Sequence, residues 1–309
     1  MSSSLCALEI QSGFDTTIHV LISLCVAASY IPQLIQIATN DQTGNAAISG
    51  WYIVLLTTSA SAHLAARVNN HISSKAWRCI RGRELEGFNA FSAALVFVQP
   101  FIHWASAIIL LAFYASYRTK VTPRGKSGDE DTSHTPSPSN PVLLAVVLTH
   151  AAILLPLACY SLQQYSTHGN ENIFVASMNA INAATVLVTG MLTSLTAAIP
   201  QIRLMVVQSR EDSRAQGSLS TLGLGLQVIA FTALAVSQGW RMRLPPPPPA
   251  DIFPWSQPAV GSRGWWGHFL FERGLAAGWL ALAVSQLLVM CVALGLGKGG
   301  GEGVGYLNL

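Results

Sequence analysis

The sequence predicts an all-α membrane protein with seven transmembrane helices in a 3+1+3 parallel-repeat arrangement. Three observations lead to this prediction: the composition, the length of the apolar runs, and a tripeptide that occurs twice. Of the 309 residues, 51% are hydrophobic and only 10% are charged, well below the roughly 25% charge of soluble domains. The apolar residues gather in runs of about 20, the length that an α-helix needs to cross a bilayer.

Seven apolar segments are expected to be membrane spans, with boundaries good to a few residues. The apolar stretch that leads into the fifth span begins at Ile173 and is too long for one perpendicular helix, so its start is expected to be interfacial or tilted. No basic segment or cleavage site precedes the first span, which is expected to act as its own signal anchor. The spans lie near residues 17–38, 48–66, 91–116, 142–161, 183–206, 219–239 and 275–296.

The segments between the spans divide the chain into a small number of units. Residues 118–141 are rich in charge, serine and proline, which predicts a flexible linker. Pro245 to Pro249 predict a stiff polyproline II spacer within a Pro-rich loop at 241–268. The predicted units are a first three-helix bundle (1–117), the linker (118–141), an inverter helix (142–165), a second three-helix bundle (173–296) and a Gly-rich tail (297–309).

The repeated tripeptide consists of an isoleucine, a proline and a glutamine, and it lies in the first and the fifth span. The two copies end in Pro32-Gln33 and Pro200-Gln201. A proline in a helix interior removes one backbone hydrogen bond at a cost of about 3 kcal/mol, and in lipid the freed carbonyl must find another donor. The neighbouring glutamine amide is a candidate for that donor, or for a contact with a solute.

The position of the two copies determines the arrangement of the repeats. An even number of crossings separates the first span from the fifth, so both copies point the same way. Two three-helix units with one inverting helix between them give this orientation, and parallel repeats place the solute site between the halves near the bilayer midplane. We therefore interpret Pro32, Gln33, Pro200 and Gln201 as hinge residues, with a purely architectural kink as the alternative. On the hinge hypothesis, Pro32→Ala or Pro200→Ala abolishes transport without affecting membrane insertion.

Each Pro-Gln pair also belongs to a three-part pattern: an apolar helix end, a polar turn and a serine-containing start of the next helix. The parts are residues 28–36, 41–44 and 47–49 in the first copy, and 196–201, 210–213 and 218–220 in the second. This pattern resembles the motif of the PQ-loop repeat family of membrane proteins, within the cystinosin/SWEET-like superfamily of amino-acid exporters and sugar uniporters. The resemblance implies a lumenal or extracellular N-terminus, cytosolic motif loops and a cytosolic tail. Lysine and arginine are spread evenly over the two sides, so the positive-inside rule does not fix the orientation.

The sequence departs from this family pattern at two places. The polar turn of the first motif has Asp41 where the family often has a basic residue, and the next helix starts with Ala47-Ile48-Ser49 instead of Gly-Leu-Ser. Gln227 stands at the position where cystinosin-like members carry an acidic residue for proton coupling. An amide cannot titrate, which puts coupling of that kind at Gln227 in doubt.

The candidate residues of a solute path are polar side chains within the spans, where no carboxylate occupies a span centre. Three of them are His63, His103 and His150, which can exchange protons with an acidic lumen or simply pack between helices. The others can line a polar cavity or form interhelical amide bonds of about 0.6–2 kcal/mol; they are Asn179, Asn182 and Gln227, with Gln238 and Gln286 as further candidates.

Several function classes are not expected. No nucleophile pair, metal cluster or phosphate-binding loop supports catalysis, so neither an enzyme nor a cofactor or metal site is predicted. The basic residues are not interleaved with aromatic residues, so nucleic-acid binding is not expected either. The five cysteines are scattered without a CxxC pair.

The predicted function is a transmembrane transporter that moves a small polar solute, with an amino acid as first candidate, by alternating access. Its expected partners are the solute and the lipid bilayer, and a homo-oligomer stays open. The tail end, residues 305–309, is similar to the tyrosine-based sorting signal of lysosomal proteins, which makes Tyr306 and Leu309 candidate contacts for a sorting adaptor. A vacuolar, lysosomal or other endomembrane location follows from that similarity. The alternatives are a receptor or trafficking protein without transport, and a sugar uniporter.

Overall fold

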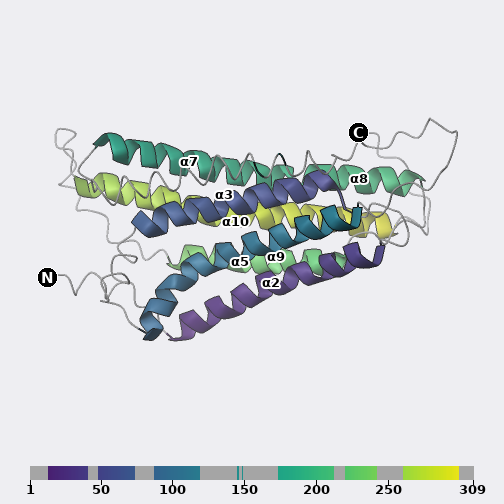
Figure 1. Cartoon of the computed structure of the whole chain (residues 1–309), viewed down its shortest axis with the longest axis horizontal. Helices are drawn as coiled ribbons and strands as arrows, with labels where there is room; N and C mark the ends of the chain where they lie inside the picture. Colours follow the sequence, from purple (N-terminus) through teal and green to yellow (C-terminus); the bar gives the residue numbers. More distant parts are fainter. Residues whose placement is uncertain are drawn as a thin grey trace.

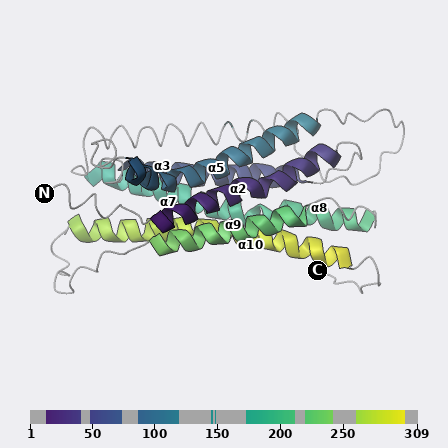
Figure 2. The same cartoon turned by 90° about the horizontal axis from the view of Figure 1, so that it is seen from below.

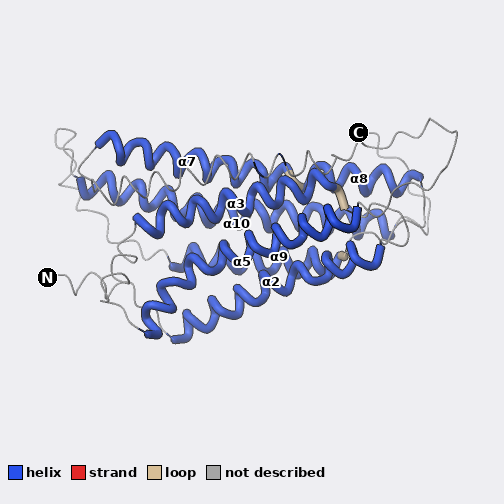
Figure 3. Tube along the Cα trace, in the orientation of Figure 1, coloured by secondary structure: helices blue, strands red, loops and turns tan. Residues whose placement is uncertain are grey.

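The computed structural model describes residues 13–40, 48–73, 87–118, 145, 148, 173–211, 220–241 and 260–298. This part of the chain is helical and contains no strand (Figure 3). Nearly all of the expected fourth span at 142–161 lies outside the described residues. The same holds for nearly all of the linker, the run Pro245 to Pro249 and most of the tail. The helices are α2 (Gly13–Asn40), α3 (Gly50–Ser73), α5 (Gly87–Arg118), α7 (Ile173–Thr196), α8 (Ala198–Glu211), α9 (Thr221–Arg241) and α10 (Val260–Lys298).

Five stretches of the described helices are long and apolar enough to cross a membrane. They are Gly13–Thr39, Phe97–Ser116, Ala184–Ser209, Thr221–Gly239 and Arg273–Leu296. The exposed side chains of α9 show where lipid is expected, since Leu222, Ile229 and Val236 recur every seven residues along one face. These observations confirm the prediction of an all-α, multi-pass membrane protein.

Helix α3 is not among those five stretches, although its 24 residues are enough to span a bilayer. Its sequence is interrupted by polar side chains such as Thr57, Ser59, His63 and Arg67. These four residues are buried in the protein, and α3 packs between α5 and α7. These polar side chains of α3 are therefore packed against other helices instead of lipid.

The described helices pack as a closed ring. Following the division expected from the sequence, we call α2, α3 and α5 the first bundle and α7–α8, α9 and α10 the second. In the first bundle α5 lies between α2 and α3, and in the second α10 lies between α7–α8 and α9. The boundary between the bundles is closed by α2 against α9 and by α3 against α7. Figures 1 and 2 show that α2, α5, α7–α8 and α10 run in one direction along the long axis, whereas α3 and α9 run in the other. The first, second and third helices of the two bundles thus correspond in order and in direction.

The two helices that follow the motifs begin in a similar way. Ser49 directly precedes α3 and Ser220 directly precedes α9. The backbone N–H of Gly223 donates to the Ser220 hydroxyl over 3.1 Å, which satisfies one of the free N–H groups at the start of α9. Because each helix begins right after its serine, residues at equal distances from Ser49 and Ser220 are equivalent positions of the two bundles.

The two motif prolines occupy different backbone settings. Pro32 lies inside α2, which is helical without interruption from Gly13 to Asn40. In the second repeat the helix is interrupted at Ala197, and Pro200 is the third residue of α8. A proline is tolerated in the first turn because the missing N–H has no helical partner there. The break is therefore confined to the second bundle.

The start of α10 differs from the expected loop boundary. Helix α10 begins at Val260, so residues 260–268, including Trp265 and Trp266, are helical instead of belonging to the Pro-rich loop at 241–268. The last proline of the sequence is Pro258, and beyond it nothing removes a backbone donor. The expected end of the Pro-rich loop at residue 268 was therefore placed too far toward the C-terminus.

Candidate functional site

Many of the buried polar side chains of the long helices lie on the boundary between the two bundles. On α3 those at the boundary are Tyr52, Ser59, His63 and Arg67, all buried, whereas buried Thr57 lies 3.4 Å from the Ala107 carbonyl of α5. The boundary residues are spaced by seven, four and four residues, which places them on one face of a helix with 3.6 residues per turn. The boundary therefore contains a row of polar groups that runs along the length of α3.

The two motif glutamines cross this boundary. Gln33 of α2 donates from Nε2 to Oε1 of Gln227 on α9 over 3.1 Å. Gln201 of α8 accepts, at its Oε1, the backbone N–H of Ser49 at the start of α3 over 2.8 Å. Each motif thus holds the second helix of the opposite bundle, an arrangement that the sequence alone does not show.

Gln33 and Gln227 belong to a wider cluster, here called the amide layer: Gln33, Tyr52, Gln227 and Gln286. The Tyr52 hydroxyl donates to Gln286 Oε1 over 2.7 Å. All four side chains are fully buried, yet Gln33 Oε1, Gln227 Nε2 and Gln286 Nε2 have no hydrogen-bond partner among the described residues. Unpaired polar atoms are costly away from water, so this layer has hydrogen-bonding capacity for a further group.

A second cluster, here called the histidine layer, consists of Tyr30, His63, His103, Phe231 and Trp279. Tyr30 Oη and His103 Nδ1 are 2.8 Å apart, and the rings of His63 and His103 lie 6.4 Å apart between centroids. Trp279 packs against both histidines, with centroid distances of 4.8 and 5.2 Å. His103 Nε2 and both ring nitrogens of His63 are buried without a hydrogen-bond partner in the described part of the chain. The histidines are thus enclosed by aromatic rings and only partly hydrogen-bonded.

Two glycines make room for the His63 ring. A Cβ atom at Gly278 of α10 would lie 2.5 Å from His63 Nε2, and one at Gly190 of α7 would lie 3.1 Å from His63 Cδ2. A Cβ atom at Gly274, one turn before Gly278, would lie still closer to its neighbour, Leu187 Cδ2 of α7. Gly274 and Gly278 therefore form the close-packing face that small residues four apart predict.

We expect Gly278→Ala to lower the free energy of unfolding by about 1–3 kcal/mol, because the added methyl group displaces the His63 ring in a packed core. The measurement is the thermal midpoint of the detergent-solubilised protein. Gly295→Ala is the matched control on the same helix, since nothing lies within 4 Å of a Cβ there. The control is expected to be neutral or stabilising, and equal effects of the two substitutions would contradict the packing role of Gly278.

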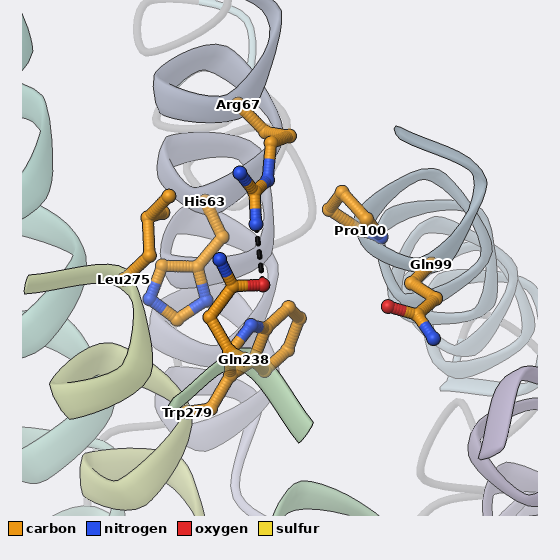
Figure 4. A pocket seen from close by; sticks show the side chains of 7 residues that line it. All are labelled: His63, Arg67, Gln99, Pro100, Gln238, Leu275 and Trp279. Carbon is orange, nitrogen blue, oxygen red and sulfur yellow. Dashed lines mark hydrogen bonds between the residues drawn. The ribbon is translucent and has the colours of Figure 1, made fainter. Parts of the chain in front are cut away.

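A small cavity lies next to the histidine layer. It has a volume of about 10 Å³, which is room for about one water molecule. Figure 4 shows Arg67 and Gln238 joined by a hydrogen bond beside it, with Trp279 below them and Pro100 across from them. The lining residues are His63, Arg67, Gln99, Pro100, Gln238, Leu275 and Trp279.

The hydrogen bond from Arg67 Nη2 to Gln238 Oε1 measures 2.5 Å and joins α3 to α9. Both side chains are buried. Arg67 follows Ser49 by the same number of residues as Gln238 follows Ser220, so the two occupy equivalent positions of the two bundles. At this depth the two bundles are therefore joined by two different residues, an arginine in the first and a glutamine in the second.

The structure brings together only some of the residues predicted for a solute path. His63, His103 and Gln227 lie on the boundary, and so do Gln238 and Gln286. Asn179 and Asn182 belong to α7, but their side chains lie outside the described residues, and so do His150, Tyr306 and Leu309 entirely. Sequence reasoning missed Tyr30, Tyr52, Arg67 and Trp279, although Tyr52, His63 and Arg67 share a helical face that could have revealed two of them.

Metal binding and similarity to known proteins add no further residues. No group of three His, Cys, Asp or Glu side chains within the described ranges is placed to hold a metal ion. No family model, no curated protein and no solved structure matches this chain. The function is therefore argued from the residues of this chain.

Proposed function

We propose that this chain is a PQ-loop repeat transporter that moves a small polar solute, with an amino acid as the first candidate, by alternating access between its two bundles. The observation that carries the proposal is the row of buried polar groups on the bundle boundary, crossed by both motif glutamines. The matching order and direction of the helices agree with parallel repeats. In the 3+1+3 arrangement, residues 142–165 are the inverter.

The unpaired polar atoms support transport over a purely structural role. A core that served only for packing would be expected to pair its buried amides and imidazoles, because each unpaired group costs about 1–3 kcal/mol. Here both layers contain such atoms: Gln33 Oε1, Gln227 Nε2 and Gln286 Nε2 in the amide layer, and His63 and His103 nitrogens in the histidine layer. A passing solute, or water in an open state, would satisfy them.

The proposal also includes the membrane in which the protein acts and the partner of its C-terminal tail. The protein acts in a vacuolar, lysosomal or other endomembrane, and the segment with Tyr306 and Leu309 contacts a sorting adaptor. The reaction is movement of the solute without chemical change, so no enzyme activity is part of the proposal.

The test is uptake by the purified full-length protein in liposomes, with a panel of labelled amino acids and sugars, with and without an inward-directed pH gradient. Uptake driven by the gradient would show a proton-coupled carrier and direct attention to His63, His103 and His150. Uptake that is equal with and without the pH gradient would show a uniporter, and preferential uptake of sugars would favour the sugar uniporter. No uptake by demonstrably folded protein would contradict the proposal.

A receptor or trafficking protein without transport is the second candidate. The observation that favours it is the size of the cavity at Arg67, which holds about one water molecule and no solute. A transporter in a closed state has the same feature. The two candidates differ in the uptake experiment, because only the transporter moves solute.

A further inference from the structure

We propose that the cavity between Arg67, His63 and Trp279 is a carboxylate-binding site, in which a carboxylate of the solute displaces Gln238 from Arg67. This inference rests on the proposed transport function and names the chemical group that the site recognises. It also gives Gln238 a specific role, as the group that occupies the site while no solute is present.

The lining of the cavity is suited to an anion. Among its described lining residues, Arg67 is a cation with donors only, and Gln238 and Trp279 carry N–H donors. The amide nitrogen of Gln99 is directed to His19 instead, 3.2 Å from Nδ1 and 3.3 Å from the carbonyl oxygen. No carboxylate belongs to this lining. The nitrogens of His63, which lines the same cavity, are buried and have no hydrogen-bond partner in the described part of the protein. A neutral imidazole always carries one N–H, so His63 can donate to an incoming oxygen.

Gln238 already places an oxygen where a carboxylate oxygen would bind. Its Oε1 accepts the Arg67 Nη2–H over 2.5 Å. A guanidinium matches a carboxylate in a bidentate, charge-assisted pair, which is about twice as strong as a hydrogen bond between neutral groups. A solute carboxylate can therefore compete with the Gln238 amide oxygen for Arg67, and released Gln238 can offer its own amide to the solute.

Displacement of Gln238 has a consequence for the bundles. The Arg67–Gln238 hydrogen bond joins α3 of the first bundle to α9 of the second. When a carboxylate replaces Gln238, this link across the boundary is lost at the moment of binding. Recognition of the solute and loosening of the boundary thus occur at one pair of side chains.

The experiment measures binding and transport with paired solutes that differ in the carboxylate alone: lysine with 1,5-diaminopentane, and histidine with histamine, with glucose as a solute of another class. Binding is the solute-induced rise of the thermal midpoint of full-length protein in detergent, and transport is uptake into liposomes. We expect the amino acids to give both signals and the amines to give signals at least about tenfold weaker, because the charge-assisted bonds are lost.

Two substitutions test the residues. Arg67→Gln should weaken the carboxylate-dependent signals by about tenfold or more, and Arg67→Lys should restore them in part, since it keeps the charge but loses the bidentate geometry. Gln238→Glu keeps the size of the side chain but gives Arg67 an internal carboxylate. It should abolish binding while raising the thermal midpoint, whereas a purely structural pair would lead to a higher midpoint with unchanged binding.

The outcomes separate the site from the transport proposal. Equal uptake of amines and amino acids, or uptake of glucose alone, would overturn the carboxylate site and leave transport standing. If wild-type protein moves none of the solutes, the transport proposal fails, and the thermal shift still tests the carboxylate site. A carboxylate-dependent shift that Gln238→Glu removes would support the site. The absence of such a shift in the wild type would overturn the site. Should Arg67→Gln fail to fold, Arg67→Lys and Gln238→Glu carry the test.

Discussion

Replacing Pro200 by alanine is expected to lower the initial rate of solute uptake by at least about tenfold, with the amount of folded, inserted protein unchanged. Alanine restores the N–H that proline lacks and removes the ring that clashes with the preceding turn, a difference of about 3 kcal/mol in favour of a continuous helix. The interruption at Ala197 would then close, and α7 and α8 would become one rigid rod. A difference of that size depopulates a hinged state about a hundredfold.

The measurement is uptake into liposomes containing equal amounts of wild-type and Pro200→Ala protein. Pro32→Ala is the comparison, because α2 is helical straight through Pro32. An equal loss in both variants would support a hinge in each bundle, as the sequence predicts, and a loss in Pro200→Ala alone would place the hinge in the second bundle. Full transport by the double variant would refute the hinge role altogether.

The difference between the two prolines shows what the repeat pattern predicts and what it does not. The duplicated Pro-Gln pairs predict two equivalent units, and the order and direction of the described helices agree with that. They do not predict that one proline lies in an unbroken helix and the other in the first turn after a break. The two sites share only the Ile-Pro-Gln tripeptide, so this tripeptide does not by itself decide whether the helix breaks. The residues before it, Ser29-Tyr30 and Ala197-Ala198, differ between the two sites, and so does the packing of the neighbouring helices.

Exchanging Gln227 for methionine is expected to lower the free energy of unfolding by about 1–3 kcal/mol, whereas exchanging both Gln33 and Gln227 is expected to restore most of that stability. The single change removes the oxygen to which Gln33 Nε2 donates and leaves a buried amide without that partner. Replacing both partners by apolar groups of similar shape is close to neutral, and methionine has the same unbranched shape. Transport is expected to be lost in the single and the double variant alike.

The measurements are thermal unfolding in detergent and uptake into liposomes. Leu226→Met is the matched control, because it places the same side chain on the exposed face of α9 next to the site. Stability that recovers without transport would show that the amide layer is kept for function and not for folding. If the double variant transported normally, the amide layer would have no part in the solute path.

The candidate site was predictable only in part, for a physical reason. Buried amides and histidines in apolar spans are unusual enough to mark Gln227, His63 and His103 from the sequence. Tyr52 and Trp279 were not marked, because aromatic residues in a membrane helix are common and only their contacts, to Gln286 and to His63, make them part of the site. Arg67 directly follows the predicted span at 48–66, where a charge is expected to face water, but the structure buries it beside Gln238.

The way the ring closes bears on the origin of the molecule. Each boundary joins the first helix of one bundle to the second helix of the other. A single three-helix unit therefore has both of the surfaces that meet at a boundary. Two identical copies of such a unit could close the same ring as a dimer. Such a dimer would set two arginines, or two glutamines, against each other at the position of Arg67 and Gln238. Joining the copies in one polypeptide is what allows one copy to hold the charge and the other to hold its acceptor.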